Sequence, residues 1–171
     1  LIPFNTLVLA KLFFIFFILI LSFSGCSNKI SEYMRPQNKE VANFYASKLN
    51  DLFVNSEEFK VKIFDMDYYT YYSVNKEDFI VVSEFIKFLK EEDFSLDDTS
   101  TYDNLRPKFK LIVEFTEDKY IFNIYDEKMS TLYPWDGIYE EDVFTMSNVP
   151  DYYNLYKFCN YVIKVSKGFE G

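Results

Sequence analysis

An unbroken apolar run near the amino terminus limits where a folded domain can lie in this chain. Lys11 precedes the run, which covers residues 12–21 and ends at a short stretch of small residues. A positive residue, an apolar stretch of roughly 7–15 residues and a small-residue boundary form the layout of an export signal. A membrane-spanning helix needs about 20 apolar residues, and extending this run backwards to that length would place Lys11 inside the membrane. The sequence therefore predicts an export signal over residues 1–25, with a permanent membrane-spanning anchor as the alternative.

The boundary of this segment reads Phe23-Ser24-Gly25-Cys26. It resembles the lipobox of bacterial lipoproteins, in which a large apolar residue and two small residues precede a cysteine. The resemblance implies that lipid is attached to the Cys26 thiol and that the chain is cleaved just before it. Phe23 stands where leucine is usual, and the alternative is a chance cysteine after a hydrophobic run. The chain is also similar in pattern to the small uncharacterised lipoproteins of clostridia and other low-GC Gram-positive bacteria.

A lipid on Cys26 would hold the rest of the chain at the extracytoplasmic face of the cell membrane. One acyl chain gives only marginal membrane binding, whereas a diacylglyceryl group supplies two chains. Residues 27–38 are polar, contain Pro36 and show no sustained periodicity, so we interpret them as a tether. We expect three parts: a signal peptide at 1–25, a lipidated cysteine and tether at 26–38, and a single domain at 39–171.

The charge of the chain narrows its possible partners. It has 27 acidic and 18 basic residues, which gives a formal net charge of −9. Such a surface repels phosphate backbones, so nucleic-acid binding is not expected. It also gains nothing from anionic lipid headgroups, so the lipid anchor has to act without electrostatic help.

Three segments show the apolar periodicity of amphipathic helices. The first covers residues 39–54. The second follows Asn75, which has the character of an N-cap with Asp78 in the first turn, and it ends near Glu92. The third has Pro150 in its first turn. Its apolar stripe consists of Tyr152, Leu155, Tyr156, Cys159, Val162 and Ile163.

The intervening segments have the period-two alternation or β-favouring composition of strands, and short turns join several of them. We expect strands at residues 59–63, 68–74, 108–115, 120–125 and 143–146, with residues 129–133 either continuing the fourth or forming another. Strands joined by short turns form antiparallel sheets. The sequence therefore predicts an α+β domain with an antiparallel sheet of about four to five strands and helices packed on one face.

The residue inventory argues against most catalytic chemistry. The chain has no histidine and only 4 glycines, so it lacks the usual general base and a Gly-rich phosphate loop. Cys159 lies on an apolar stripe and is expected to be a buried, inert thiol. Two loops are rich in acids: Asp93, Asp97, Asp98 and Asp103 in one, and Asp136, Glu140, Glu141 and Asp142 in the other. Neither has the spacing of a calcium loop, so we interpret them as solvated acidic surface. We expect no enzymatic activity, no catalytic residue, no cofactor and no metal site.

Two aromatic groups are the candidates for binding. On the segment 68–74, alternation puts Tyr69 and Tyr71 on one side and Tyr68 and Tyr72 on the other, so one pair should be exposed. The second group consists of Tyr133, Trp135 and Tyr139, around a turn at 134–137. Exposed aromatics suit a protein interface or sugar stacking. Our first hypothesis is a non-enzymatic interaction domain for an envelope protein, and the alternative is a carbohydrate or cell-wall module that uses these aromatics.

Overall fold

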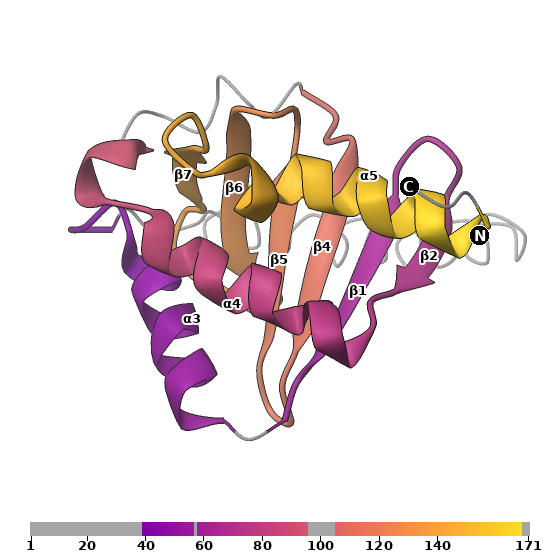
Figure 1. Cartoon of the computed structure of the whole chain (residues 1–171). Coiled ribbons are helices and arrows are strands. Elements are labelled where there is room, and N and C mark those ends of the chain that lie inside the picture. The colour runs from indigo at the N-terminus through magenta and orange to yellow at the C-terminus, as the bar shows by residue number, and fades with distance from the viewer. Residues whose placement is uncertain (1–38, 57, 96–104, 169–171) are drawn as a thin grey trace, which may run out of the picture. The chain divides into compact units, whose positions relative to one another are not determined.

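The computed structural model describes residues 39–56, 58–95 and 105–168, which belong to one compact unit at Gln37–Gly171 (Figure 1). The predicted export signal, Cys26 and the tether lie outside the described residues. Three α-helices, labelled as in the figure, are α3 at Phe44–Asn55, α4 at Phe79–Phe88 and α5 at Leu155–Ser166. No helix of the described part is long and apolar enough to cross a membrane.

The sheet has seven strands, more than the four to five predicted. Their bounds are β1 Lys60–Asp65, β2 Thr70–Ser73, β3 Phe94–Ser95, β4 Phe109–Glu114, β5 Lys119–Ile124, β6 Met129–Pro134 and β7 Asp142–Thr145. The order across the sheet is β2-β1-β4-β5-β6-β7-β3, and every neighbouring pair is antiparallel. The α+β class and the antiparallel sheet are as the sequence predicted.

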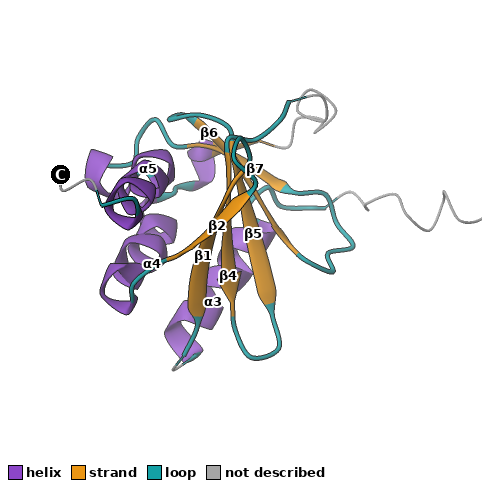
Figure 2. Cartoon of the chain, turned by 90° about the vertical axis from the view of Figure 1, so that its right-hand side faces the viewer, coloured by secondary structure: helices purple, strands orange, loops and turns teal. Residues whose placement is uncertain are grey.

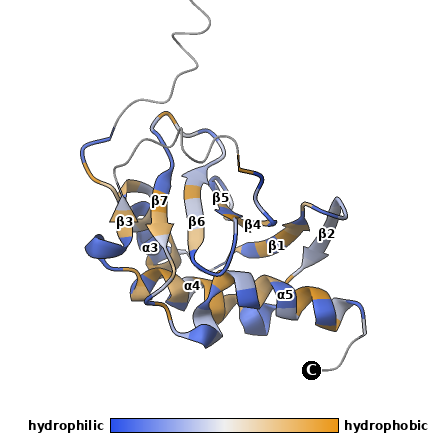
Figure 3. Cartoon of the chain, turned by 90° about the horizontal axis from the view of Figure 1, so that it is seen from above, coloured by the Kyte–Doolittle hydropathy of each residue, from blue (hydrophilic) through white to orange (hydrophobic). Residues whose placement is uncertain are grey.

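All three helices contact the same face of the sheet. Phe85 of α4 packs against Phe122 of β5, with ring centroids 5.9 Å apart, and Tyr156 of α5 lies over Phe109 of β4. The α3 backbone is hydrogen-bonded to Asp142 of β7. Figure 2 shows α4 and α5 on one side of the strands, and Figure 3 shows them running across that same side of the sheet. We call this the inner face.

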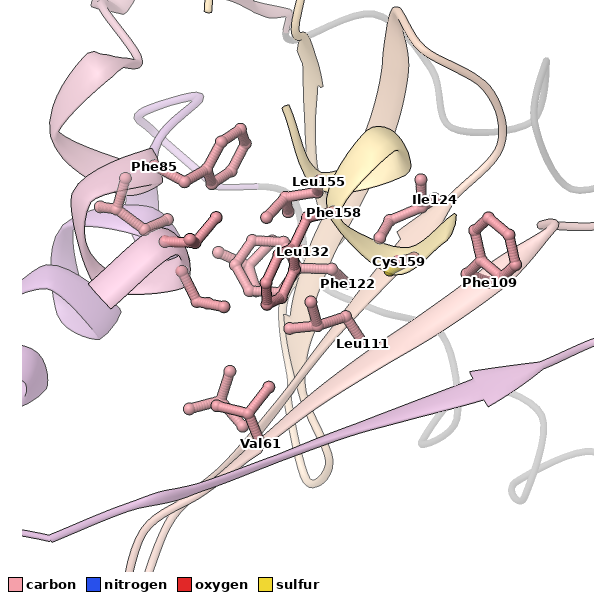
Figure 4. Packing of buried hydrophobic residues seen from close by; sticks show 14 of the residues in the cluster. Val61, Phe85, Phe109, Leu111, Phe122, Ile124, Leu132, Leu155, Phe158 and Cys159 are labelled. Carbon is pink, nitrogen blue, oxygen red and sulfur yellow. The ribbon is translucent and has the colours of Figure 1, made fainter. Parts of the chain in front are cut away.

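The core lies between this inner face and the helices (Figure 4). Alternate strand residues point into it, and the largest of the fully buried side chains include Phe85, Phe109, Phe122, Phe144 and Leu111. Cys159 of α5 is fully buried in the same core and is a free thiol, as predicted. Burial raises the pKa of the Cys159 thiol well above its usual value, which keeps it protonated and unreactive.

Several element boundaries differ from the predictions. Helix α3 begins at Phe44 rather than Lys39, and Val41, which precedes the helix, is exposed. Helix α4 ends at Phe88 because residues 91–93 form a separate 3₁₀ turn. Strand β3 was not predicted at all, since it is two residues long and pairs only with the distant β7.

The predicted start of the last helix was also wrong. Pro150 precedes a 3₁₀ turn at Asp151–Tyr153, and α5 begins only at Leu155. Asn154 caps α5, because its Oδ1 accepts hydrogen bonds from the backbone N–H groups of Tyr156 and Lys157. Asn75, the cap expected from the sequence, precedes a 3₁₀ turn and makes no side-chain capping bond.

Candidate functional site

The face of the sheet opposite the helices carries a row of basic and aromatic side chains. Residues directly opposite in antiparallel strands share a face. The register pairs Phe64 with both Tyr71 and Lys110, Lys62 with Ile112, and Lys60 with Glu114. We call the basic and aromatic members of this row the tyrosine–lysine face; they are Lys60, Lys62, Phe64, Tyr69, Tyr71 and Lys110.

The β1–β2 hairpin builds the aromatic end of this face. Asp65, at the end of β1, accepts hydrogen bonds from the backbone N–H groups of Asp67 and Tyr68, and this arrangement starts the turn. Tyr69 occupies the left-handed region of backbone conformation with φ of 52°. The sequence prediction of a strand from Tyr68 was therefore wrong, because Tyr68 and Tyr69 lie in the turn and β2 begins at Thr70.

The division of the four tyrosines between two sides was nevertheless confirmed. Tyr69 and Tyr71 both contact Phe64, with ring centroids 6.1 Å and 4.6 Å from it. On the other side, the Nζ atom of Lys167, just after α5, lies 4.7 Å from the ring centroid of Tyr68 and 5.8 Å from that of Tyr72. Tyr72 packs against the core, and Tyr69 and Tyr71 are 70% and 63% exposed. Tyr68 is 69% exposed as well, so the prediction that only one of the two pairs is exposed was wrong for Tyr68.

The charge of the tyrosine–lysine face is opposite to that of the chain. Three lysines project from it, and the acidic residue directly opposite one of them, Lys60, is Glu114. Glu114 accepts a hydrogen bond from Lys62 at 2.8 Å and pairs with Lys119 at 3.1 Å, and these contacts lower the pKa of its carboxyl. Lys60 and Lys110 form no ion pair within the described part of the chain. Their charges are therefore available to an acidic partner.

The second predicted aromatic group does not form one patch. Trp135 is 72% exposed, and the Lys119 ammonium lies 5.4 Å from its ring centroid. Tyr133 is half-buried opposite Ile121, and burial raises the pKa of Tyr133 to about 12. Tyr139 packs inward against Phe44, with ring centroids 4.9 Å apart. Only Trp135 of these three presents a free aromatic face.

A buried ion pair joins the start of the described chain to the beginning of β7. The Nζ atom of Lys39 lies 2.5 Å from Oδ1 of Asp142 and also donates to the backbone oxygen of Glu141. The other carboxylate oxygen of Asp142 accepts a hydrogen bond from the backbone N–H of Ala46 at 2.7 Å. Burial raises the pKa of Asp142, and the hydrogen bond from Lys39 opposes that shift. No local sequence pattern predicted this pair, because its members are far apart along the chain.

Two of the predicted surface acids are therefore structural. Asp142 is buried in the ion pair, and buried Asp93 accepts hydrogen bonds from the Asn148 side chain and the Lys90 backbone. The solvated-surface interpretation was wrong for both. Within the described ranges, no group of three potential ligand residues lies close enough to hold a metal ion. The remaining acids of the first loop, Asp97, Asp98 and Asp103, lie outside the described residues.

An open cleft of about 710 Å³ lies beside the β4–β5 hairpin. Its apolar part is the ring cluster of Phe59, Phe79 and Phe115, and its rim carries both acids and lysines. No pair of its groups is aligned as a nucleophile with a base. The structure thus offers an exposed basic and aromatic sheet face and one exposed tryptophan as its candidate binding features.

The fold is that of a small α+β domain, and comparison with known proteins gives its family. The chain belongs to the family described as Domain of unknown function (DUF4883), which matches residues 39–159. No curated protein matches the chain. Among solved structures, it is similar to a crystal structure of a protein described as a lipoprotein from Clostridium perfringens. The two are 28% identical with a TM-score of 0.66, and the match covers 74% of this chain and 98% of that chain. The chain thus resembles an uncharacterised clostridial lipoprotein.

Proposed function

We propose that this chain is a membrane-anchored extracytoplasmic lipoprotein whose domain binds an acidic region of an envelope protein and catalyses no reaction. The lipid anchor would be attached to Cys26, after removal of residues 1–25. The similar protein from Clostridium perfringens, described as a lipoprotein, supports this location. The absence of histidine from the sequence supports a role in binding rather than catalysis.

The observation that carries the binding role is the tyrosine–lysine face. Tyrosine is enriched in protein interfaces because its ring offers a large contact area and its hydroxyl remains hydrogen-bonded. Tyr71 supplies such a ring, and Lys60 and Lys110 supply positive charge in a chain of net charge −9. Charge complementarity of this kind favours acidic partners and raises the rate of association.

The anchor is tested by mass and by acylation. The mature protein should begin at Cys26, incorporate labelled palmitate and partition into detergent. The Cys26→Ala variant should take up no fatty acid and should keep its full-length mass. If purified native protein retained residues 12–25 or took up no fatty acid, the segment would be a membrane-spanning anchor instead.

The binding role is tested by cross-linking and pull-down from envelope extracts with two matched double variants. Tyr71→Ser with Lys110→Glu changes the tyrosine–lysine face, whereas Tyr161→Ser with Lys128→Glu makes the same changes at exposed positions elsewhere. We expect the first to lose a partner that the wild type and the second retain. Recovery of no partner, together with turnover on a broad substrate panel, would contradict the proposal.

A carbohydrate or cell-wall ligand remains the second candidate, and the exposure of Trp135 is what favours it. Stacking on a sugar ring requires a free aromatic face, which Trp135 has. A titration with wall fragments should then change the fluorescence of Trp135, the only tryptophan in the chain. An unchanged spectrum at saturating fragments would exclude this use of the ring.

A further inference from the structure

A turn between β6 and β7 exposes two large apolar side chains on a rigid support. We call residues 135–138 the Trp135 turn; Trp135 is 72% exposed and Ile138 is 59% exposed. The backbone N–H of Trp135 donates to Lys119, and that of Gly137 donates to Pro134. A Cβ atom at Gly137 would lie only 2.8 Å from the Tyr45 hydroxyl. The position therefore has no room for a side chain, and the two backbone hydrogen bonds hold Trp135 in its exposed place.

The same contacts fix the turn beside the point where the described chain begins. The Tyr45 hydroxyl donates to the backbone oxygen of Tyr139 and accepts from its N–H, at 3.2 and 2.9 Å. Lys39 is held by Asp142 in the buried ion pair. Exposed Val41 lies between Lys39 and Tyr45 in sequence, so a third apolar side chain belongs to the same region. Residues 39–45 and 135–142 therefore form one joined cluster.

The length of chain between Cys26 and this cluster limits how far the cluster can lie from the anchor. Residues 27–38 span at most about 40 Å when extended, and a flexible chain of that length averages roughly 20 Å end to end. A domain of this size has a radius of gyration of about 14 Å. An acyl anchor at Cys26 therefore keeps the side of the domain around Lys39 closer to the bilayer than the opposite side.

The chemistry of the turn suits the boundary between lipid and water. Tryptophan prefers this boundary because its ring is apolar and its N–H is polar. Lys119, whose ammonium lies 5.4 Å from the Trp135 ring centroid, has a flexible stem that allows its charge to stay in water while the ring is buried. Asp136 and Glu140 flank the exposed side chains, so anionic headgroups would be repelled.

We infer that the Trp135 turn rests on the bilayer that anchors the protein, with Trp135 and Ile138 in shallow contact with the lipid. This inference rests on the proposed acylation of Cys26, and it goes further by fixing which side of the domain faces the membrane. The tyrosine–lysine face adjoins this turn, because Lys119 lies beside the Trp135 ring and also pairs with Glu114, so a protein partner would bind toward the Tyr71 end of that face.

The test uses the purified acylated protein bound to phosphatidylcholine vesicles whose acyl chains carry bromine near the headgroup. Flotation with the vesicles reports the anchor, and quenching of tryptophan fluorescence reports the turn. Trp135 is the only tryptophan, so the quenched signal belongs to it alone. We expect a blue-shifted spectrum and strong quenching, with severalfold weaker quenching when the vesicles contain mainly anionic lipid at low salt.

Two variants keep the fluorophore and change only the surface. Ile138→Glu should float as well as the wild type and lose most of the quenching. Ile80→Glu changes an equally apolar residue that is 52% exposed on α4, and it should leave the quenching unchanged.

The outcomes separate this inference from the proposed function. Flotation without quenching overturns the membrane-facing turn and leaves the anchor standing. Absence of flotation removes the anchor and the inference with it. If wall fragments shift the Trp135 spectrum and brominated lipid does not, the ring is a sugar site and the inference is wrong.

Discussion

Lys39 and Asp142 are 103 residues apart in sequence and form a buried ion pair, with 2.5 Å between Nζ and Oδ1. Their side chains are 5% and 0% exposed. The pair joins the segment before α3 to β7, so the first described residue of the chain is fixed to the edge region of the sheet. Buried ion pairs contribute little net stability when intact, but removal of one partner leaves an uncompensated charge.

Asp142→Asn should therefore lower the free energy of unfolding by about 3–5 kcal/mol. The amide oxygen of asparagine still accepts a hydrogen bond from the Ala46 N–H. The loss of stability is therefore due to the unpaired buried charge of Lys39 and not to the backbone hydrogen bond. Urea unfolding of Asp142→Asn, Lys39→Met and the double variant forms a cycle. The double variant should lose clearly less than the sum of the single losses, and strict additivity would show that the two residues do not interact.

The stability of variants at Tyr69 should depend on how well each new residue tolerates the left-handed backbone conformation. A non-glycine residue in this region costs about 1–2 kcal/mol, which glycine avoids and a β-branched residue increases. Tyr69→Gly should thus be at least about 1 kcal/mol more stable than Tyr69→Val. At Tyr71, in the extended strand β2, the order should be reversed, because valine favours strands. Thermal unfolding of the four variants measures both differences, and the same order at both positions would refute the argument.

Asn154→Ala should destabilise the protein by about 1–2 kcal/mol, because the cap of α5 is lost. The same side chain donates from Nδ2 to the backbone oxygen of Glu127, so Asn154→Asp should be intermediate: it keeps the cap and loses this donor. Asn75→Ala is the matched control, since Asn75 makes no side-chain capping bond. Denaturant midpoints should rank the wild type and Asn75→Ala together, then Asn154→Asp, then Asn154→Ala. A large loss in Asn75→Ala would contradict this assignment of the caps.

The stability of the protein should fall at alkaline pH because two tyrosine hydroxyls that are buried or half-buried lose their protons. Burial raises the pKa of Tyr120 and Tyr133 from 10.0 to about 12. A group that holds its proton more tightly in the folded state contributes stability that is present below pH 10 and is lost as pH rises through about 12. Unfolding midpoints should therefore decline over this window. Tyr133→Phe should reduce the slope and remove part of the tyrosinate absorbance that appears near pH 12, whereas Tyr152→Phe, at an exposed phenol, should leave the slope unchanged.

The sequence predicted those parts of the fold that depend on near neighbours. Alternation over residues 108–125 was enough to locate the β4–β5 hairpin, because both strands and their turn are continuous in sequence. It was not enough for β3, whose two residues form a strand only because β7 lies beside them. Asn75 and Asn154 show the same limit, since both have the local character of a helix cap and only the tertiary structure decides which side chain caps a helix.

The candidate site shows the same limit: its local features were predicted from the sequence, and those that depend on distant segments were not. Alternation separated Tyr69 and Tyr71 from Tyr68 and Tyr72, but it did not show that only Tyr72 of the four packs against the core, because that depends on where α5 packs. The arrangement of Lys110 beside Phe64 and Tyr71, with Lys60 farther along the same face, depends on the pairing of β1 with both β2 and β4. Tyr139 was grouped with Trp135 by sequence distance, and it turns inward because Phe44 of α3 offers a packing partner.

The order of strands in the sheet has a consequence for how the protein acquires its structure. The amino-terminal half supplies both ends of the sheet, β2 and β1 at one end and β3 at the other, and the later strands β4 to β7 fill the space between. Strands β4 to β6 are joined by short hairpins and are able to form early, because their pairing closes small loops. Strands β1 and β2 can pair with each other, and β1 can pair with β4, whereas β3 has no partner until β7 is present. A chain released before β7 would keep the edge of β6 unpaired and β3 without a partner, so folding completes only after nearly the whole domain has been synthesised.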